Sequence, residues 1–181
     1  VAIIHRRAAA WLAQHDRREA AIQHALAAGD YDQAADFIAA TARTLVLRGG
    51  GATLQAWLQH LPREVIAARP TLLIEQAWAL VLDGRLDEVE EVLSELESRE
   101  LTDVLRGEVA AIRAIVATVH QDIAGIHRYA AEALQLIPLD NSQLRCGVLL
   151  SQGTAASLSG ASGQAVDLLT QAIRESEQGR Q

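Results

Sequence analysis

The chain has 181 residues, of which 50% are hydrophobic and only 3% are aromatic, and its formal net charge is -7. Most of the hydrophobic residues are Ala and Leu, which lose little side-chain freedom in a helix, so the composition predicts an all-α protein. The acidic charge disfavours direct nucleic-acid binding, and no run of about eighteen apolar residues suggests a membrane span, so we expect a cytoplasmic protein.

Two further absences narrow the function. Every basic residue is Arg, so the chain lacks the lysine of a phosphate-binding P-loop. The single cysteine, Cys146, excludes an internal disulfide and lies in an apolar run, where packing is its expected role. The chain starts at Val1 and contains no methionine, which we interpret as the sign of a piece of a larger protein.

Apolar residues at three- and four-residue steps predict four helices in the first third of the chain. Gly29 ends the second helix, Asp30 caps the third, and the glycines at 49–51 end the third. The predicted ranges of the first, second and fourth helices are 2–14, 16–28 and 53–60.

Pro62 and Pro70 bracket a short segment between two helices that each carry a tryptophan, Trp57 and Trp78. Proline has no amide hydrogen and disfavours helical geometry in the residue before it, so each proline ends one helix and can lie in the first turn of the next. We therefore predict a single helical turn at 63–68, with a sharp corner on each side.

Beyond Pro70 the pattern predicts antiparallel helix pairs joined by short turns at Gly84, Gln121 and Gly160, which are 37 and 39 residues apart. The predicted helices are 72–82, 86–96, 104–119, 123–137, 144–158 and 165–173. The second helix of each pair repeats one register: Leu86, Val89, Leu93, Leu96; Ile123, Ile126, Ala130, Ala133; Ser162, Ala165, Leu169, Ala172. Such units bury their apolar faces only against neighbours, so we predict a tetratricopeptide-like, right-handed α-α superhelix.

A turn-rich pattern joins the first helices to this array. It consists of Arg48, Gly49, Thr53, Leu54, Trp57, Leu58, Leu61, Pro62, Val65, Arg69, Pro70, Leu72, Ala77, Trp78, Ala79, Leu80 and Gly84. With these residues the chain resembles the sensor region of MalT-like, LuxR-type bacterial transcriptional regulators, which are signal-transduction ATPases. The resemblance covers roughly residues 4–96, and the segment GDYDQAADF at 29–37 is also similar to the second helix of a tetratricopeptide repeat.

We predict one superhelical domain over 1–181, as a fragment of a larger protein. Its parts are a helical lead-in over 1–28, a first hairpin with the proline-bracketed insertion over 29–69, and regular hairpins over 70–181. The resemblance implies an ATPase module before this region and a helix-turn-helix domain after it, so ATP is implied for the parent protein and no cofactor for this chain. It also implies a small-molecule inducer and self-association of the parent regulator.

We predict that a ligand lies along the concave side of the superhelix, on the first helix of each pair. Trp78 is the leading candidate, because its ring suits a sugar and it lies six residues before the turn at Gly84; hairpin packing is the alternative role for Trp78 and for Trp57. The predicted strip consists of Thr71, Ile74, Trp78, Glu108, Thr118, Thr154 and Ser157.

Two other functions were weighed. One is a stand-alone scaffold that binds a peptide segment of a partner protein in the groove. The other is a hydrolase that uses Glu75 or Glu108, which is disfavoured because no paired acids in a defined pocket are evident. A metal site at His120 and His127 is disfavoured too, since a turn separates them, so we predict no catalytic residue and no metal ligand.

Overall fold

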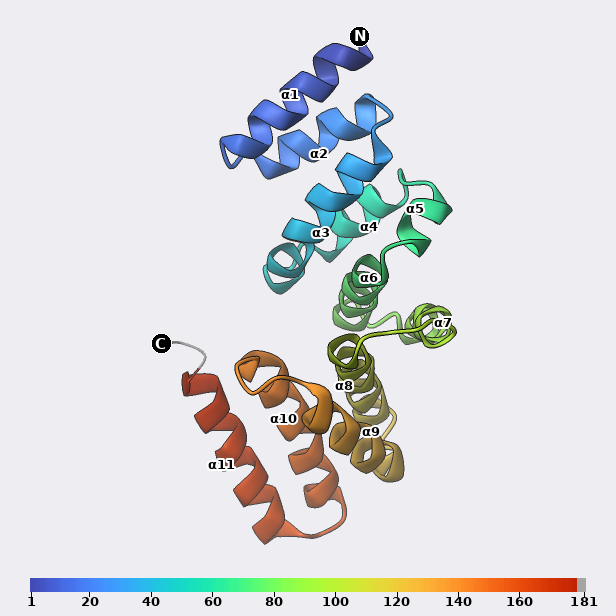
Figure 1. Cartoon of the computed structure of the whole chain (residues 1–181). Coiled ribbons are helices and arrows are strands. Elements are labelled where there is room, and N and C mark those ends of the chain that lie inside the picture. Colours follow the sequence, from blue (N-terminus) through green and yellow to red (C-terminus); the bar gives the residue numbers. More distant parts are fainter. Residues whose placement is uncertain (179–181) are drawn as a thin grey trace. The chain divides into compact units, whose positions relative to one another are not determined.

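The structure is a computed structural model that describes residues 1–178. In this range it contains eleven helices and no strand (Figure 1), so the all-α prediction is confirmed. The helices are α1 (Ala2–Gln14), α2 (Arg18–Ala27), α3 (Tyr31–Leu47), α4 (Gly51–Leu58), α5 (Arg63–Ala67), α6 (Pro70–Leu82), α7 (Leu86–Glu97), α8 (Asp103–Val119), α9 (Ile123–Leu136), α10 (Ser142–Leu158) and α11 (Ser162–Gln178).

The helix boundaries follow the predicted ranges closely, and the differences have local causes. The second helix begins at Arg18 rather than at Asp16, because Asp16 has φ +56°, which a right-handed helix cannot accommodate. The glycines at 49–51 were expected to lie between two helices, but Gly51 is the first residue of α4. Gly49, with φ +81°, is the residue that reverses the chain there.

The chain divides into two compact units, Val1–Leu96 and Glu97–Gln181, and each is described by itself. The division falls inside the segment 70–181 that was predicted to form regular hairpins. The organisation of 1–181 as one domain stays a prediction.

Helix α3 is the centre of the first unit, because it packs against α2, α4, α5 and α6. Its inner residues Ala34, Ile38 and Ala42 are 0% exposed, at the spacing that the sequence predicts for one helix face. Complete burial of an Ile side chain stabilises a fold by about 1.5–3 kcal/mol. Asp30 caps this helix as predicted, since its side chain accepts a hydrogen bond from the backbone nitrogen of Gln33.

Both proline corners lie where they were predicted. Pro62 is the N-cap residue of α5, and Pro70 is the first residue of α6. Arg69, which precedes Pro70, has φ −127° and ψ 84°, outside the helical region as expected for a residue before proline. The chain therefore changes direction twice between α4 and α6.

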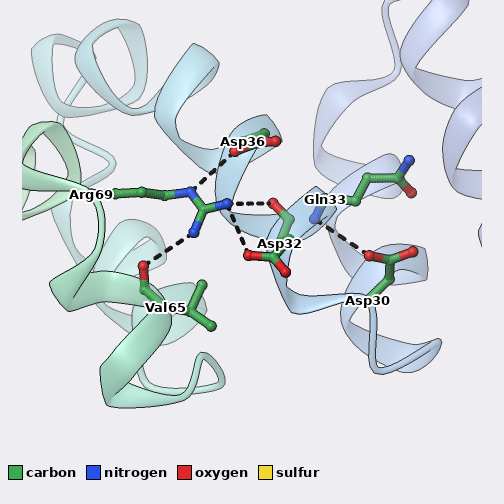
Figure 2. A network of polar contacts seen from close by, with 6 residues as sticks. All are labelled: Asp30, Asp32, Gln33, Asp36, Val65 and Arg69. Carbon is green, nitrogen blue, oxygen red and sulfur yellow. Dashed lines mark hydrogen bonds and ion pairs between the residues drawn. The ribbon is translucent and has the colours of Figure 1, made fainter.

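The second corner is attached to α3 by Arg69 (Figure 2). Its guanidinium donates hydrogen bonds from Nε to Oδ1 of Asp36 over 3.1 Å and from Nη2 to Oδ1 of Asp32 over 3.0 Å. Nη1 also donates to the backbone carbonyl of Val65 in α5, over 3.2 Å. One side chain thus connects α5, the corner and the start of α3.

The pKa of Arg69 lies above its ordinary value. Partial burial of the guanidinium acts to lower it, but the hydrogen bonds to Asp32 and Asp36 and the negative charge of these two carboxylates more than offset that effect. Arg69 therefore stays protonated at every pH at which the protein is folded.

The second unit consists of two helix pairs, α8 with α9 and α10 with α11, and α10 also packs against both α8 and α9 (Figure 1). On α9, Ile126, Ala130 and Ala133 are 0% exposed, as the repeated register predicts. Gly107 allows α8 to approach the end of α9 closely. A Cβ atom at Gly107 would lie 3.0 Å from Cβ of Leu136.

The last helix, α11, buries only part of its predicted stripe. Ala165 and Ala172 are buried, but Leu169 is 39% exposed. Val166 and Ile173 next to it are 63% and 59% exposed. The same register that is covered on α9 is therefore partly open on α11.

The turns that define the predicted repeat share one backbone conformation. The φ angle is +72° at Gly84, +57° at Gln121 and +76° at Gly160, and the earlier Gly29 has +68°. Glycine adopts this left-handed region freely, whereas other residues do so at a cost. The assignment of Gln121 to a turn, made without a glycine to mark it, is confirmed.

Candidate ligand-binding site

The seven residues of the predicted strip lie on three helices. Thr71, Ile74 and Trp78 are on α6, in the first compact unit. The other four are on α8 and α10, in the second unit. The two groups are therefore described separately.

On α6 the strip faces the interior more than expected. Ile74 is 1% exposed and offers no surface to a ligand, while Thr71 is exposed. Trp78 is half-buried and packs against the core cluster of the first unit. Its Nε1 atom is buried and has no hydrogen-bond partner. Packing thus accounts for much of the Trp78 side chain.

A charged contact lies beside Trp78. Nε of Arg43 on α3 donates to Oε1 of Glu75 on α6 over 2.7 Å, and the Arg43 Cζ atom lies 5.9 Å from the Trp78 ring centroid. The Glu75 side chain is 10% exposed and that of Arg43 is 39% exposed. A carboxylate engaged in this way orients α6 against α3, which is a structural role.

On α8 and α10 the strip is accessible. Thr154 and Ser157 are exposed, and Glu108 and Thr118 are half-buried. The Thr118 hydroxyl donates to the carbonyl of Ala114 over 2.8 Å, and the Thr154 hydroxyl donates to its own helix in the same way. Both hydroxyl oxygens can still accept hydrogen bonds. Because α8 and α10 pack together, the structure brings this part of the strip onto one pair of helices.

A recess in the first unit was not predicted. It has a volume of about 440 Å³ and lies between α2, the start of α3 and α4. Its walls are mostly apolar, with polar groups at a few points. The lining residues are Gln23, Leu26, Ala27, Tyr31, Ala56, Trp57 and His60.

The polar groups of this recess have defined roles. Nδ1 of His60 lies 2.7 Å from the carbonyl oxygen of Ala56, so Nδ1 donates and Nε2 is left as an acceptor. Tyr31 is 39% exposed, and Trp57 is only 7% exposed. Trp57 is thus part of the core and shows one edge to the recess. The two aromatic residues were visible in the sequence, but their approach depends on the packing of α2 with α3 and α4.

No helix among residues 1–178 is both long enough and apolar enough to cross a lipid bilayer.

The chain is similar to parts of longer regulatory proteins. It is 39% identical over 142 residues to the HTH-type transcriptional regulator MalT of Cronobacter sakazakii, an alignment that covers 76% of this chain and 16% of that protein. It is 31% identical over 175 residues to MalT of Serratia proteamaculans, covering 93% of this chain and 19% of that protein. The serine/threonine-protein kinase PknK of Mycobacterium tuberculosis is 33% identical over 142 residues, or 74% of this chain and 13% of the kinase.

No family model matches the chain, and no solved structure matches it. The relatives define a regulator-type region that forms part of larger proteins. The chain is a MalT-like regulator region, which confirms the resemblance seen in its sequence, and it spans less than a fifth of the length of these relatives.

Proposed function

We propose that this chain is the ligand-sensing and protein-interaction part of a bacterial LuxR-type, MalT-like transcriptional regulator in the cytoplasm. It binds a small inducer and relays that event to ATPase and DNA-binding domains outside this chain, and the parent regulator self-associates. The similarity to MalT supports a transcriptional output. The similarity to PknK indicates that related regions also occur in a kinase, so the output domain is the less certain part of the proposal to transfer.

The architecture that we propose is a tetratricopeptide-like, right-handed superhelix. Two observations support it within the second unit. Helix α10 packs against both helices of the preceding pair, which is how repeats bury their apolar faces. The turns at Gln121 and Gly160 have the same left-handed backbone.

The observation that carries the sensing function is the recess beside Trp57. Small-molecule sites are concave and mostly apolar, have volumes of about 300–1,000 Å³, and contain a few polar groups that orient the ligand. The recess has a volume of about 440 Å³, an apolar wall from Leu26, Ala27 and Ala56, and polar tips from Gln23 and His60. These groups suit a neutral ligand with an apolar face and hydroxyl or carbonyl groups.

We propose no catalytic activity and no cofactor for this chain, with ATP bound by the absent ATPase domain. Glu75, one of the two carboxylates considered for hydrolysis, is engaged by Arg43. Glu108 is half-buried on the surface of α8 and, among residues 1–178, no cluster of three or more His, Cys, Asp or Glu side chains could hold a metal beside it.

The test is a thermal-shift screen of sugars and other small neutral metabolites, followed by calorimetric titration of each compound that stabilises the chain. Tyr31→Ala and His60→Ala should each weaken binding at least tenfold. Thr154→Ala on α10 is the matched control and should leave the affinity unchanged. Binding that depends on Thr154 and not on Tyr31 would instead place the ligand on the strip predicted from the sequence.

A stand-alone scaffold that binds a peptide is the second candidate, and exposed residues on α10 favour it. Leu150 is 46% exposed, one helical turn before the exposed Thr154. An apolar side chain beside hydroxyl groups can contact an extended peptide. Selection from a peptide library should then yield binders that Leu150→Asp abolishes, while no small molecule in the screen raises the melting temperature.

A further inference from the structure

Two histidines meet between α1 and α2 in the first unit. The Nδ1 atoms of His5 and His24 lie 2.8 Å apart, and the ring centroids are separated by 5.0 Å with the rings tilted by 39°. Both side chains are half-buried. Only one of the two nitrogens can carry the shared hydrogen, so the lone pair of the other points toward it.

This pair differs from two other histidines in the same unit. Nδ1 of His15 lies 2.7 Å from the carbonyl oxygen of Trp11, and Nδ1 of His60 lies 2.7 Å from that of Ala56. A carbonyl only accepts, so those Nδ1 atoms donate within their own helices. In His5 and His24 the two Nδ1 atoms instead converge from different helices on one point.

The distance between them suits a metal ion with ligands at right angles. At the metal–nitrogen distance of about 2.0–2.1 Å that imidazole adopts, two nitrogens 2.8 Å apart subtend about 90° at a shared ion. A tetrahedral ion would require a separation of about 3.3 Å at the same bond length. Adjacent positions at 90° are those of square-planar and octahedral Cu²⁺ and Ni²⁺, for which imidazole is a suitable ligand.

We propose that His5 and His24 form a binding site for a divalent late transition metal, Cu²⁺ or Ni²⁺, through their two Nδ1 atoms. No third His, Cys, Asp or Glu joins them among the described residues, so water fills the remaining positions. The nearby cation Arg6 is paired with Asp30 over 3.2 Å, which reduces its repulsion of the ion. The proton on one Nδ1 moves to Nε2 of the same ring through solvent, so the neutral pair binds the ion without net proton release.

The bound ion would connect two helices that otherwise share little core. Ala9 is the one fully buried residue of α1, whereas Ile3, Ile4 and Trp11 are 71%, 72% and 57% exposed. A metal that bridges α1 to α2 would therefore hold α1 in place more strongly than its apolar contacts do.

The experiment is calorimetric titration of the tag-free chain with Ni²⁺ and with Cu²⁺ in a weakly coordinating buffer. His5→Ala and His24→Gln should each reduce the affinity at least tenfold, while His15→Ala and His60→Ala leave it unchanged. Equal affinity in wild type and His5→Ala would overturn the proposal, and so would a similar loss in all four variants.

A second measurement does not depend on the fold of any variant. In ¹H–¹⁵N spectra of the imidazole groups of the wild-type chain, diamagnetic or paramagnetic perturbation by Ni²⁺ should be strongest at Nδ1 of His5 and His24. Strongest perturbation at His120 or His127 would contradict the proposal.

Discussion

Arg69 donates a hydrogen bond from Nη2 to Oδ1 of Asp32 over 3.0 Å, which links the corner before α6 to the first turn of α3 (Figure 2). The backbone conformation that Pro70 imposes on Arg69 orients the guanidinium toward α3. An arginine followed by proline at this corner therefore acts as one device. Pro70 turns the chain, and Arg69 fixes the direction of the turn.

Arg69→Ala should lower the free energy of unfolding by about 1–2 kcal/mol, because ion pairs with exposed carboxylates contribute about 0–1 kcal/mol each and one further hydrogen bond is lost. The Asp32 and Asp36 side chains are 81% and 68% exposed, so the effect should shrink in high salt. Urea unfolding at low and high ionic strength measures both effects. Arg63→Ala in α5 is the control, and a loss as large as that of Arg69→Ala would contradict the assigned role.

Gly107→Ala should destabilise the chain by about 1–3 kcal/mol, because the new methyl group overpacks the contact between α8 and α9. Its Cβ would lie 3.0 Å from Cβ of Leu136 and 3.2 Å from the backbone nitrogen of Ile137. Gly147→Ala in α10 is the matched control, since nothing lies within 4 Å of the added Cβ there. It should stabilise by about 0.5–1 kcal/mol through helix propensity. Thermal unfolding that gives both substitutions the same sign would refute the close approach.

Gln121→Gly should raise the free energy of unfolding by about 0.5–1 kcal/mol, because Gln121 has φ +57° and glycine relieves the strain of a side chain in the left-handed region. Ala131→Gly, at an exposed site within α9, should lower stability by about 1 kcal/mol. Chemical denaturation compares the two. If Gln121→Gly destabilises as much as Ala131→Gly, the turn does not have this geometry in solution.

Arg43→Met should cost more stability than Glu75→Gln, about 2–4 against about 1–2 kcal/mol, because removing one partner of a pair costs most when a buried charge remains. The Glu75 side chain is 10% exposed, whereas Arg43, at 39%, can still reach water. The exposed pair of Arg85 with Glu88 is the control, and Arg85→Ala should cost roughly 0–0.5 kcal/mol. Equal costs for Arg43→Met and Arg85→Ala would show that the pair is fully hydrated.

The helices and their turns could be predicted from the sequence because they depend on local signals. Pro62, Pro70 and Gly84 constrain the backbone near themselves, and the spacing of Ala34 and Ile38 marks a buried face without knowledge of its partner. The start of α2 was missed, since the left-handed conformation of Asp16 has no marker in the sequence. The division of the chain near Leu96 was missed because it depends on how helices pack, not on any one segment.

The candidate site was less predictable because exposure is set by the neighbouring helices. Helical register correctly places Thr154 and Ser157 on an accessible face, but the same argument selected Ile74, which α6 turns toward the core. The recess beside Trp57 combines residues from three helices, and no spacing along one helix reveals it. For the same reason, the approach of His5 to His24 is not visible in the sequence.

The left-handed corners at Gln121 and Gly160 have a consequence for protein engineering. Because both corners have the same backbone handedness, removing or duplicating the stretch from one to the other should rejoin helices in phase. An excision of any other length would rotate the following helix about its axis and expose its apolar side. Whole hairpins are therefore the natural cassettes for shortening or extending this protein.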